Sequence, residues 1–153
     1  MRSLHKIGPF VLVLVASAWL PSTSFAELAQ WDQERVTAIA AELTKACDSL
    51  YDTFQKEPER TLGSGQFKDF YRLRQLIRRI KSEARQLSSA LAQGEGYDQT
   101  LPIYDNLMAM VRDAREVSKR TFTSSFVLDK ASAAGDVLQQ MAPYYDPTAL
   151  EGG

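Results

Sequence analysis

Residues 67–93 read FKDFYRLRQLIRRIKSEARQLSSALAQ, and this stretch decides the fold. Its apolar residues follow one another at alternating intervals of three and four positions, which on an α-helix places them on a single stripe. No proline or glycine interrupts the run, and Gly94 follows it, where a left-handed residue often ends a helix. The residues of this stripe are Phe70, Leu73, Ile77, Ile80, Ala84, Leu87 and Leu91.

The rest of this predicted helix is strongly basic. It carries seven cationic side chains and two acidic ones, Asp69 and Glu83, which leaves a local charge of +5. A helix with so apolar a stripe must lay it against partner helices. The basic residues are Lys68, Arg72, Arg74, Arg78, Arg79, Lys81 and Arg85.

The first 26 residues have the layout of a secretory signal peptide. Arg2 and Lys6 precede an apolar stretch too short to span a bilayer, and Ser24-Phe25-Ala26 places small residues where a signal peptidase cleaves. We therefore predict a signal peptide at 1–26, a domain at 27–147 and a short tail at 148–153. Removal of residues 1–26 changes the charge from −1 to −3, because it takes away two basic residues and no acidic one.

Three further amphipathic helices are expected. One covers about 29–55 and precedes a polar linker at 56–65; another follows the turn at 94–98 and contains Pro102 in its first turn. The last begins with Ser124 or Ser125 as its N-cap and is ended by Pro143 and Pro147. These elements predict an all-α fold, an antiparallel up-down-up-down four-helix bundle. Their expected core stripes are Val36, Ile39, Leu43, Ala46 and Leu50; Ile103, Leu107, Met110, Ala114 and Val117; and Val127, Ala131, Ala134, Leu138 and Met141.

This topology would bring aromatic residues to one end of the bundle and basic residues to the other. The aromatic group, which contains Trp31, Tyr97, Tyr104, Tyr144 and Tyr145, would be either a plug that closes the core or a platform for a ligand. The small residues at 131–135 would let a neighbouring chain segment approach closely.

The inventory of reactive side chains excludes several classes of enzyme. The only histidine, His5, lies in the predicted signal peptide, so the remaining chain has no imidazole for a catalytic triad, a zinc site or a haem. We expect no cofactor and no metal, since the inward positions of the stripes carry no carboxylates. Cys47, the only cysteine, is either a buried hydrophobic residue or a reactive or intermolecularly bonded thiol.

The sequence thus predicts an exported helical bundle, periplasmic or secreted, that binds a partner without catalysis. Carriage of a small ligand between the helices is the alternative, and an enzyme is the least favoured reading. The predicted partner is an anionic protein surface or lipid head groups, not nucleic acid, and the mature chain should have no transmembrane segment. The residues expected to form this docking surface are Arg72, Arg79, Arg115 and Lys119.

Overall fold

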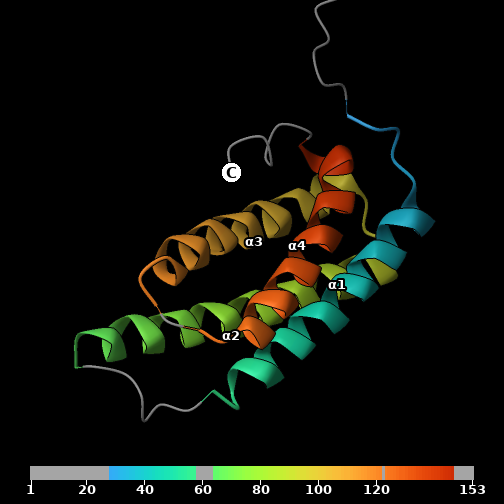
Figure 1. The fold of residues 1–153 in the computed structure, drawn as a ribbon. Coiled ribbons are helices and arrows are strands. Elements are labelled where there is room, and N and C mark those ends of the chain that lie inside the picture. Colours follow the sequence, from blue (N-terminus) through green and yellow to red (C-terminus); the bar gives the residue numbers. More distant parts are fainter. Residues whose placement is uncertain (1–27, 58–63, 122, 147–153) are drawn as a thin grey trace, which may run out of the picture.

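The computed structural model describes residues 28–57, 64–121 and 123–146, and within these ranges it contains four helices and no strand (Figure 1). The predicted all-α class is therefore confirmed over this part of the chain, as a helical bundle. The predicted signal peptide and C-terminal tail lie outside the described residues. The helices are α1 (Gln33–Phe54), α2 (Ser64–Ala92), α3 (Tyr97–Ser118) and α4 (Ser125–Tyr145).

The helices pack as a row and do not close into a ring. Helix α1 packs extensively against both α2 and α4, and α2 packs against α1 and α3, but α3 and α4 touch at only a few places. In Figure 1 the end of α4 lies beside the beginning of α3, and the two helices spread apart toward the loop that joins them. One side of the bundle is therefore left open between α3 and α4.

The stripe of α2 forms the centre of the core. All seven of its predicted residues are buried, none more than 6% exposed, so this stripe is confirmed. The stripe of α1 is confirmed as well, apart from Ala46, which is only partly buried. Because α1 and α2 each pack against two neighbours, their apolar faces are covered along most of their length. The buried residues of α1 are Val36, Ile39, Ala40, Leu43, Cys47, Leu50 and Phe54.

The helix ends differ in part from those predicted. Helix α1 begins four residues later than expected, because the Asp32 side chain accepts a hydrogen bond from the Arg35 backbone N–H and caps it. Helix α2 begins at Ser64, within the predicted linker. Its first turn includes Gly65, and a glycine is tolerated there because the N–H groups of a first turn have no partner within the helix. Gly94, with φ of +87°, and the N-cap Ser124 are confirmed.

Two predictions about proline were wrong. Pro102 is the sixth residue of α3 and lies in its second turn, and Pro143 lies inside α4 without ending it. The last turn of α4 continues past Pro143 because the backbone oxygen of Pro143 accepts a hydrogen bond from the Ala29 N–H, and because Tyr145 is buried among aromatic rings. Tertiary contacts thus outweigh the local preference of proline.

Candidate binding cleft

An apolar cleft lies on the open side of the bundle, between α3 and α4. Its volume is about 130 Å³, and all four helices contribute to its lining. Buried core residues of α1 and α2 form its floor: Cys47, Leu50, Leu73, Ile77 and Ile80. The lining from α3 is Val111, Ala114, Arg115 and Ser118, and the lining from α4 includes Val127, Leu128, Ala131, Ala134, Gly135 and Leu138.

The cleft exists because the facing stripes of α3 and α4 are not fully covered. Met110 and Ala114 are only half-buried, and Ala131, which we predicted to be a core residue, is exposed. The prediction for Ala131 was wrong because it assumed that α3 and α4 pack against each other along their whole length. Short side chains such as those of Ala114 and Ala131 cannot bridge the distance between two diverging helices. The apolar stripes therefore line a groove.

Exposed apolar side chains mark the beginning of α4. Phe126 is 73% exposed and Leu128 is 55% exposed, and Leu128 also belongs to the lining of the cleft. Single exposed apolar residues are common, but an exposed leucine beside an apolar cleft extends that cleft onto the surface. Sequence analysis missed both residues, because they lie next to the predicted stripe of α4.

One charged residue lines the cleft. Arg115 is exposed and, among the described residues, forms no ion pair. Arg112 and Lys119 lie on the neighbouring turns of α3, and Lys119 is paired with Glu116 at 2.7 Å. Asp113 and Glu116 also lie on this stretch, so the positive charge at the α3 edge of the cleft is that of Arg115.

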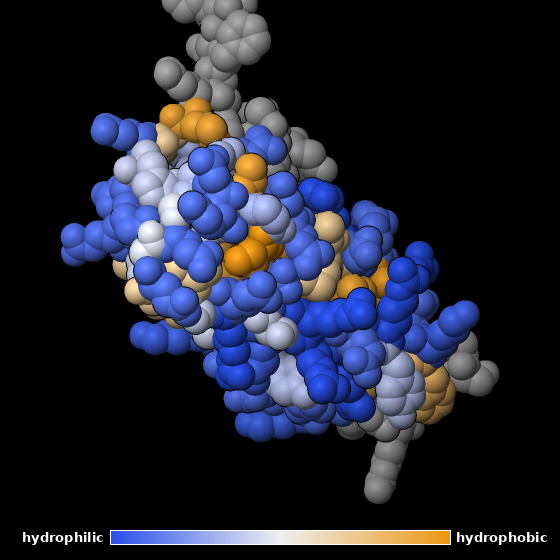
Figure 2. Space-filling model, turned by 180° about the vertical axis from the view of Figure 1, so that it is seen from behind, coloured by the Kyte–Doolittle hydropathy of each residue, from blue (hydrophilic) through white to orange (hydrophobic). Residues whose placement is uncertain are grey.

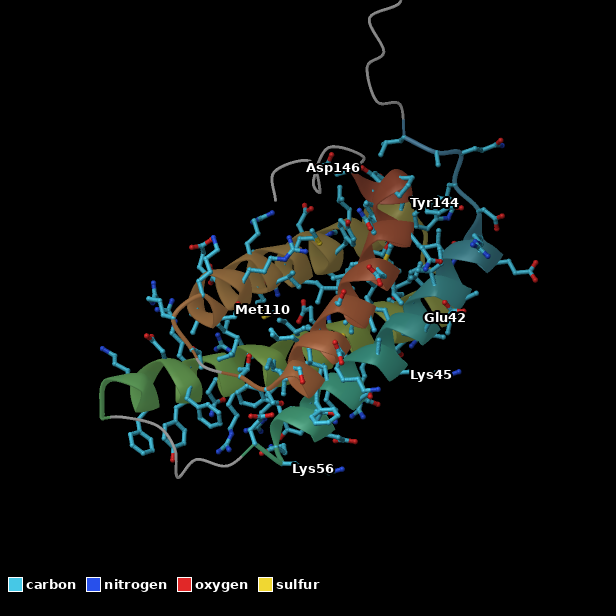
Figure 3. All side chains as sticks on the ribbon, viewed as in Figure 1. Glu42, Lys45, Lys56, Met110, Tyr144 and Asp146 are labelled. Carbon is cyan, nitrogen blue, oxygen red and sulfur yellow. The ribbon has the colours of Figure 1, made fainter. Side chains whose placement is uncertain are left out.

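The four basic residues of the predicted docking surface are all exposed, but they do not line one depression. Arg79 lines a second, more polar depression between α2 and α3, together with Ser82, Glu83, Asn106 and Met110. Met110 is labelled on α3 in Figure 3. Figure 2 shows the molecule from behind, and on that face the apolar patches are small and separated by hydrophilic residues. Arg115 lines the apolar cleft instead.

Part of the basic face of α2 is neutralised by acidic residues. Asp48 on α1 pairs with Lys81 at 3.4 Å and with Arg85 at 3.0 Å. Asp69, on α2 itself, pairs with Arg120 just after α3, at 3.5 Å. Desolvation by itself would raise the pKa of the Asp48 carboxyl, but the hydrogen bond from Arg85 and the charge of Lys81 outweigh it and lower that pKa. Asp48 of α1 thus neutralises part of the charge on one flank of α2.

The predicted aromatic group closes the end of the bundle at which α3 begins and α4 ends. The Tyr145 ring stacks on Tyr104 and on Tyr97, with ring centroids 4.3 and 5.9 Å apart, and Trp31 packs edge-on against Tyr97 and Tyr145. The Tyr145 hydroxyl is also hydrogen-bonded to Thr100 at 2.8 Å. Tyr144, labelled in Figure 3 near the end of α4, packs against the same core. These contacts favour the plug over the ligand platform.

Two buried groups in the core have raised pKa values. Burial, and to a smaller extent the charge of Asp48, raises the pKa of the Cys47 thiol to about 12, so this thiol stays protonated at neutral pH. Burial, followed by the charge of Asp146, likewise raises the pKa of Tyr104 to about 12. Cys47 is 1% exposed, which confirms its interpretation as a small buried hydrophobic residue.

Two further kinds of site, a metal site and a membrane-spanning helix, were sought among the described residues. In the described part of the chain, no three histidine, cysteine or acidic side chains converge in a way that could hold a metal ion. Among the four described helices, none combines the length and the apolar character that a membrane span requires.

No family model matches the chain, and searches of curated proteins and of solved structures found no match.

Proposed function

We propose that this protein is exported, acts in the periplasm or outside the cell, and binds another protein without catalysing a reaction. The proposal of export rests on the signal-peptide layout of residues 1–26. N-terminal sequencing of protein recovered from outside the cytoplasm should begin at Glu27. An intact Met1 on a membrane-embedded product would contradict export and leave the proposal of binding standing.

The proposal includes an antiparallel up-down-up-down order of the four helices. Two contacts between α1 and α2 support it, since Gln33 donates to the backbone oxygen of Leu91 whereas Asp48, further along α1, pairs with Arg85. The contacts between α2 and α3 also run in opposite directions: Asp69 pairs with Arg120, and Glu83 accepts a hydrogen bond from Asn106.

The observation that carries the proposal of binding is the apolar cleft between α3 and α4. A cleft that combines an apolar floor, an exposed leucine at its edge and one arginine without an ion pair in the described part of the chain has the composition of a recognition site. Its volume of about 130 Å³ is below the roughly 300–1,000 Å³ of pockets that enclose small-molecule ligands. A partner that rests on the cleft and inserts a side chain suits it better than a carried molecule does.

Catalysis is not part of the proposal. The one thiol has a strongly raised pKa and cannot act as a nucleophile near neutral pH, and no histidine lies outside residues 1–26 to serve as a general base. The broader docking surface of Arg72, Arg79, Arg115 and Lys119 remains a prediction, and the proposed function needs only Arg115 from it.

A photo-crosslinking amino acid at position 131 tests the proposed function. Ala131 is an exposed alanine that lines the cleft, and Ala41 is an exposed alanine on α1 that does not line it, so position 41 is the matched control. In cells of the natural host, position 131 should give a protein adduct that position 41 does not give. The absence of an adduct at position 131, or the same adduct at both positions, would contradict binding at the cleft.

A further inference from the structure

We propose that the cleft between α3 and α4 binds an amphipathic α-helix of a partner protein, and that this helix carries carboxylates beside its apolar stripe. The inference rests on the proposed function and specifies the chemistry of the partner. Three observations support it: the shape of the cleft, the surroundings of Gly135 and the charge of Arg115.

The cleft is long and narrow. Its lining extends along α4 from Val127 to Leu138, which corresponds to about 16 Å at about 1.5 Å per residue, and along α3 from Val111 to Ser118. A comparable apolar cavity of about 150 Å³ holds one benzene molecule, so 130 Å³ accommodates about one large apolar side chain. An α-helix that lies along the cleft and inserts one or two apolar side chains fits these dimensions.

Gly135 lies inside α4, where glycine destabilises a helix by roughly 0.5–1 kcal/mol relative to alanine. A Cβ atom at this position would meet no other atom within 4 Å, so nothing in the described fold requires glycine here. Gly135 lines the cleft one turn after the exposed Ala131. Together these two residues form a shallow, low wall, against which the backbone of a second helix can pack closely.

The charge at the cleft selects an acidic partner. Arg115 is the only charged residue among the described residues that line it, and it forms no ion pair there. Arg112, on the preceding turn of α3, is a second exposed cation, whereas Lys119 is paired with Glu116. An arginine fork binds a carboxylate through two hydrogen bonds, so a helix with glutamate or aspartate beside its leucines would satisfy the apolar floor and the positive edge at once.

The test uses designed peptides of about four helical turns, or about 14 residues. The first peptide has leucines on one stripe and glutamates along its flank; the second has lysines in place of the glutamates, and the third has serines in place of the leucines. Fluorescence polarisation should show that the first binds at least about tenfold more tightly than the other two. Backbone amide NMR signals of Ala131 and Gly135 should shift when it binds, and those of Ala41 should not.

Variants of the protein locate the binding site. Arg115→Glu should weaken binding of the acidic peptide at least about tenfold, whereas Arg78→Glu, at an exposed arginine that lines neither depression, should leave it within about twofold. Gly135→Leu should also weaken binding at least about tenfold, because its side chain would occupy the open wall. Thermal unfolding of each variant should show that the fold is retained, and Gly135→Ala, which should unfold no earlier than the wild type, gives a second, smaller probe of the same position.

Three outcomes would overturn the inference. These are equal binding of the acidic and basic peptides, an equal loss from Arg78→Glu and Arg115→Glu, and Arg115-dependent binding to phosphatidylglycerol vesicles without any binding to the acidic peptide. The last would assign the cleft to lipid. An adduct from position 131 in cells together with failure of the acidic peptide would reject only the acidic helix. No adduct from position 131 would reject the proposed function as well.

Discussion

The rings of Tyr104 and Tyr145 are stacked nearly parallel, with centroids 4.3 Å apart and an angle of 9° between their planes, but only one of their hydroxyl groups is hydrogen-bonded. The Tyr145 hydroxyl is 2.8 Å from Oγ1 of Thr100. The Tyr104 hydroxyl is buried and has no hydrogen-bond partner among the described residues. Two chemically identical groups in one stack should therefore make opposite contributions to stability.

Removal of each hydroxyl should reveal this difference. Tyr104→Phe should leave the free energy of unfolding unchanged or raise it by up to about 1 kcal/mol, because it removes a buried polar group without a partner. Tyr145→Phe should lower it by roughly 0.5–1.5 kcal/mol, because a buried hydrogen bond is lost. Urea unfolding of both variants measures the two changes. A loss of stability from Tyr104→Phe would show that its hydroxyl has a partner in solution.

Truncation of the core should cost different amounts near the cleft and away from it. Leu87 is fully buried and does not line the cleft, and Leu87→Ala should lower the free energy of unfolding by about 2–5 kcal/mol. Ile77 is part of the cleft floor, so Ile77→Ala should fall near the lower end of this range, since its removal widens a space that is already open.

The exposed Arg79 provides the control for both truncations, and Arg79→Ala should change stability by no more than about 0.5 kcal/mol. Denaturant unfolding of the three variants measures these changes in the free energy of unfolding. Equal costs for Ile77→Ala and Arg79→Ala would mean that the stripe of α2 does not face the core.

The buried Cys47 thiol should react slowly with a thiol reagent until the protein unfolds. Its pKa is raised to about 12 from an ordinary value of 9.0, so between these pH values the unfolded thiol is ionised and the folded one is not. Stability contributed by the protonated thiol is therefore present below pH 9.0 and falls as the pH rises toward 12. Labelling rates measured with and without denaturant check this prediction.

A cysteine at position 41 in a Cys47→Ala background is the matched control, because Ala41 is exposed on the same helix. It should react quickly in the folded protein. If Cys47 reacted equally quickly, the cleft would have to open far enough to expose its floor.

Asp48 should make stability depend on acid pH. The ion pairs with Arg85 and Lys81 lower the pKa of its carboxyl from 3.8, so the unfolded state takes up a proton first as the pH falls. The contribution of Asp48 is thus present above pH 3.8 and is lost as the pH falls below it. Because the pair is partly exposed, this contribution should be no more than about 1 kcal/mol. The difference in unfolding free energy between the wild type and Asp48→Asn, measured as a function of pH, should shrink in that window.

Sequence periodicity predicted α1 and α2 well because each has neighbours on two sides. A stripe such as Phe70 to Leu91 is buried whatever the details of its packing, so spacing alone identifies it. The stripe of α4 could not be judged in this way. Whether Ala131 is buried depends on the angle between α3 and α4, and that angle depends on contacts distant in sequence, among them those of Tyr145.

The candidate site was predictable only in its ingredients. Arg115 and the small residues near Gly135 were both noticed in the sequence, but periodicity does not indicate that they line one cleft. The grouping of Arg79 with Arg115 was reasonable from topology, since both lie toward the same region of the bundle. The structure assigns them to separate depressions, because Arg79 on α2 lines the depression between α2 and α3, whereas Arg115 lines the cleft between α3 and α4.

The aromatic plug has a mechanical consequence for the cleft. The plug pins the beginning of α3 to the end of α4 at Tyr145, and the cleft lies toward the opposite end of α4, where Val127 is about 27 Å away along the helix axis. Over this lever arm, a rotation of about 5° at the pivot would displace the far end by about 2 Å. We therefore expect packing at Tyr145 to affect the width of the cleft at Leu128, together with the contacts that hold α4 against α1. A substitution among these tyrosines would change the width of the cleft, although none of them lines it.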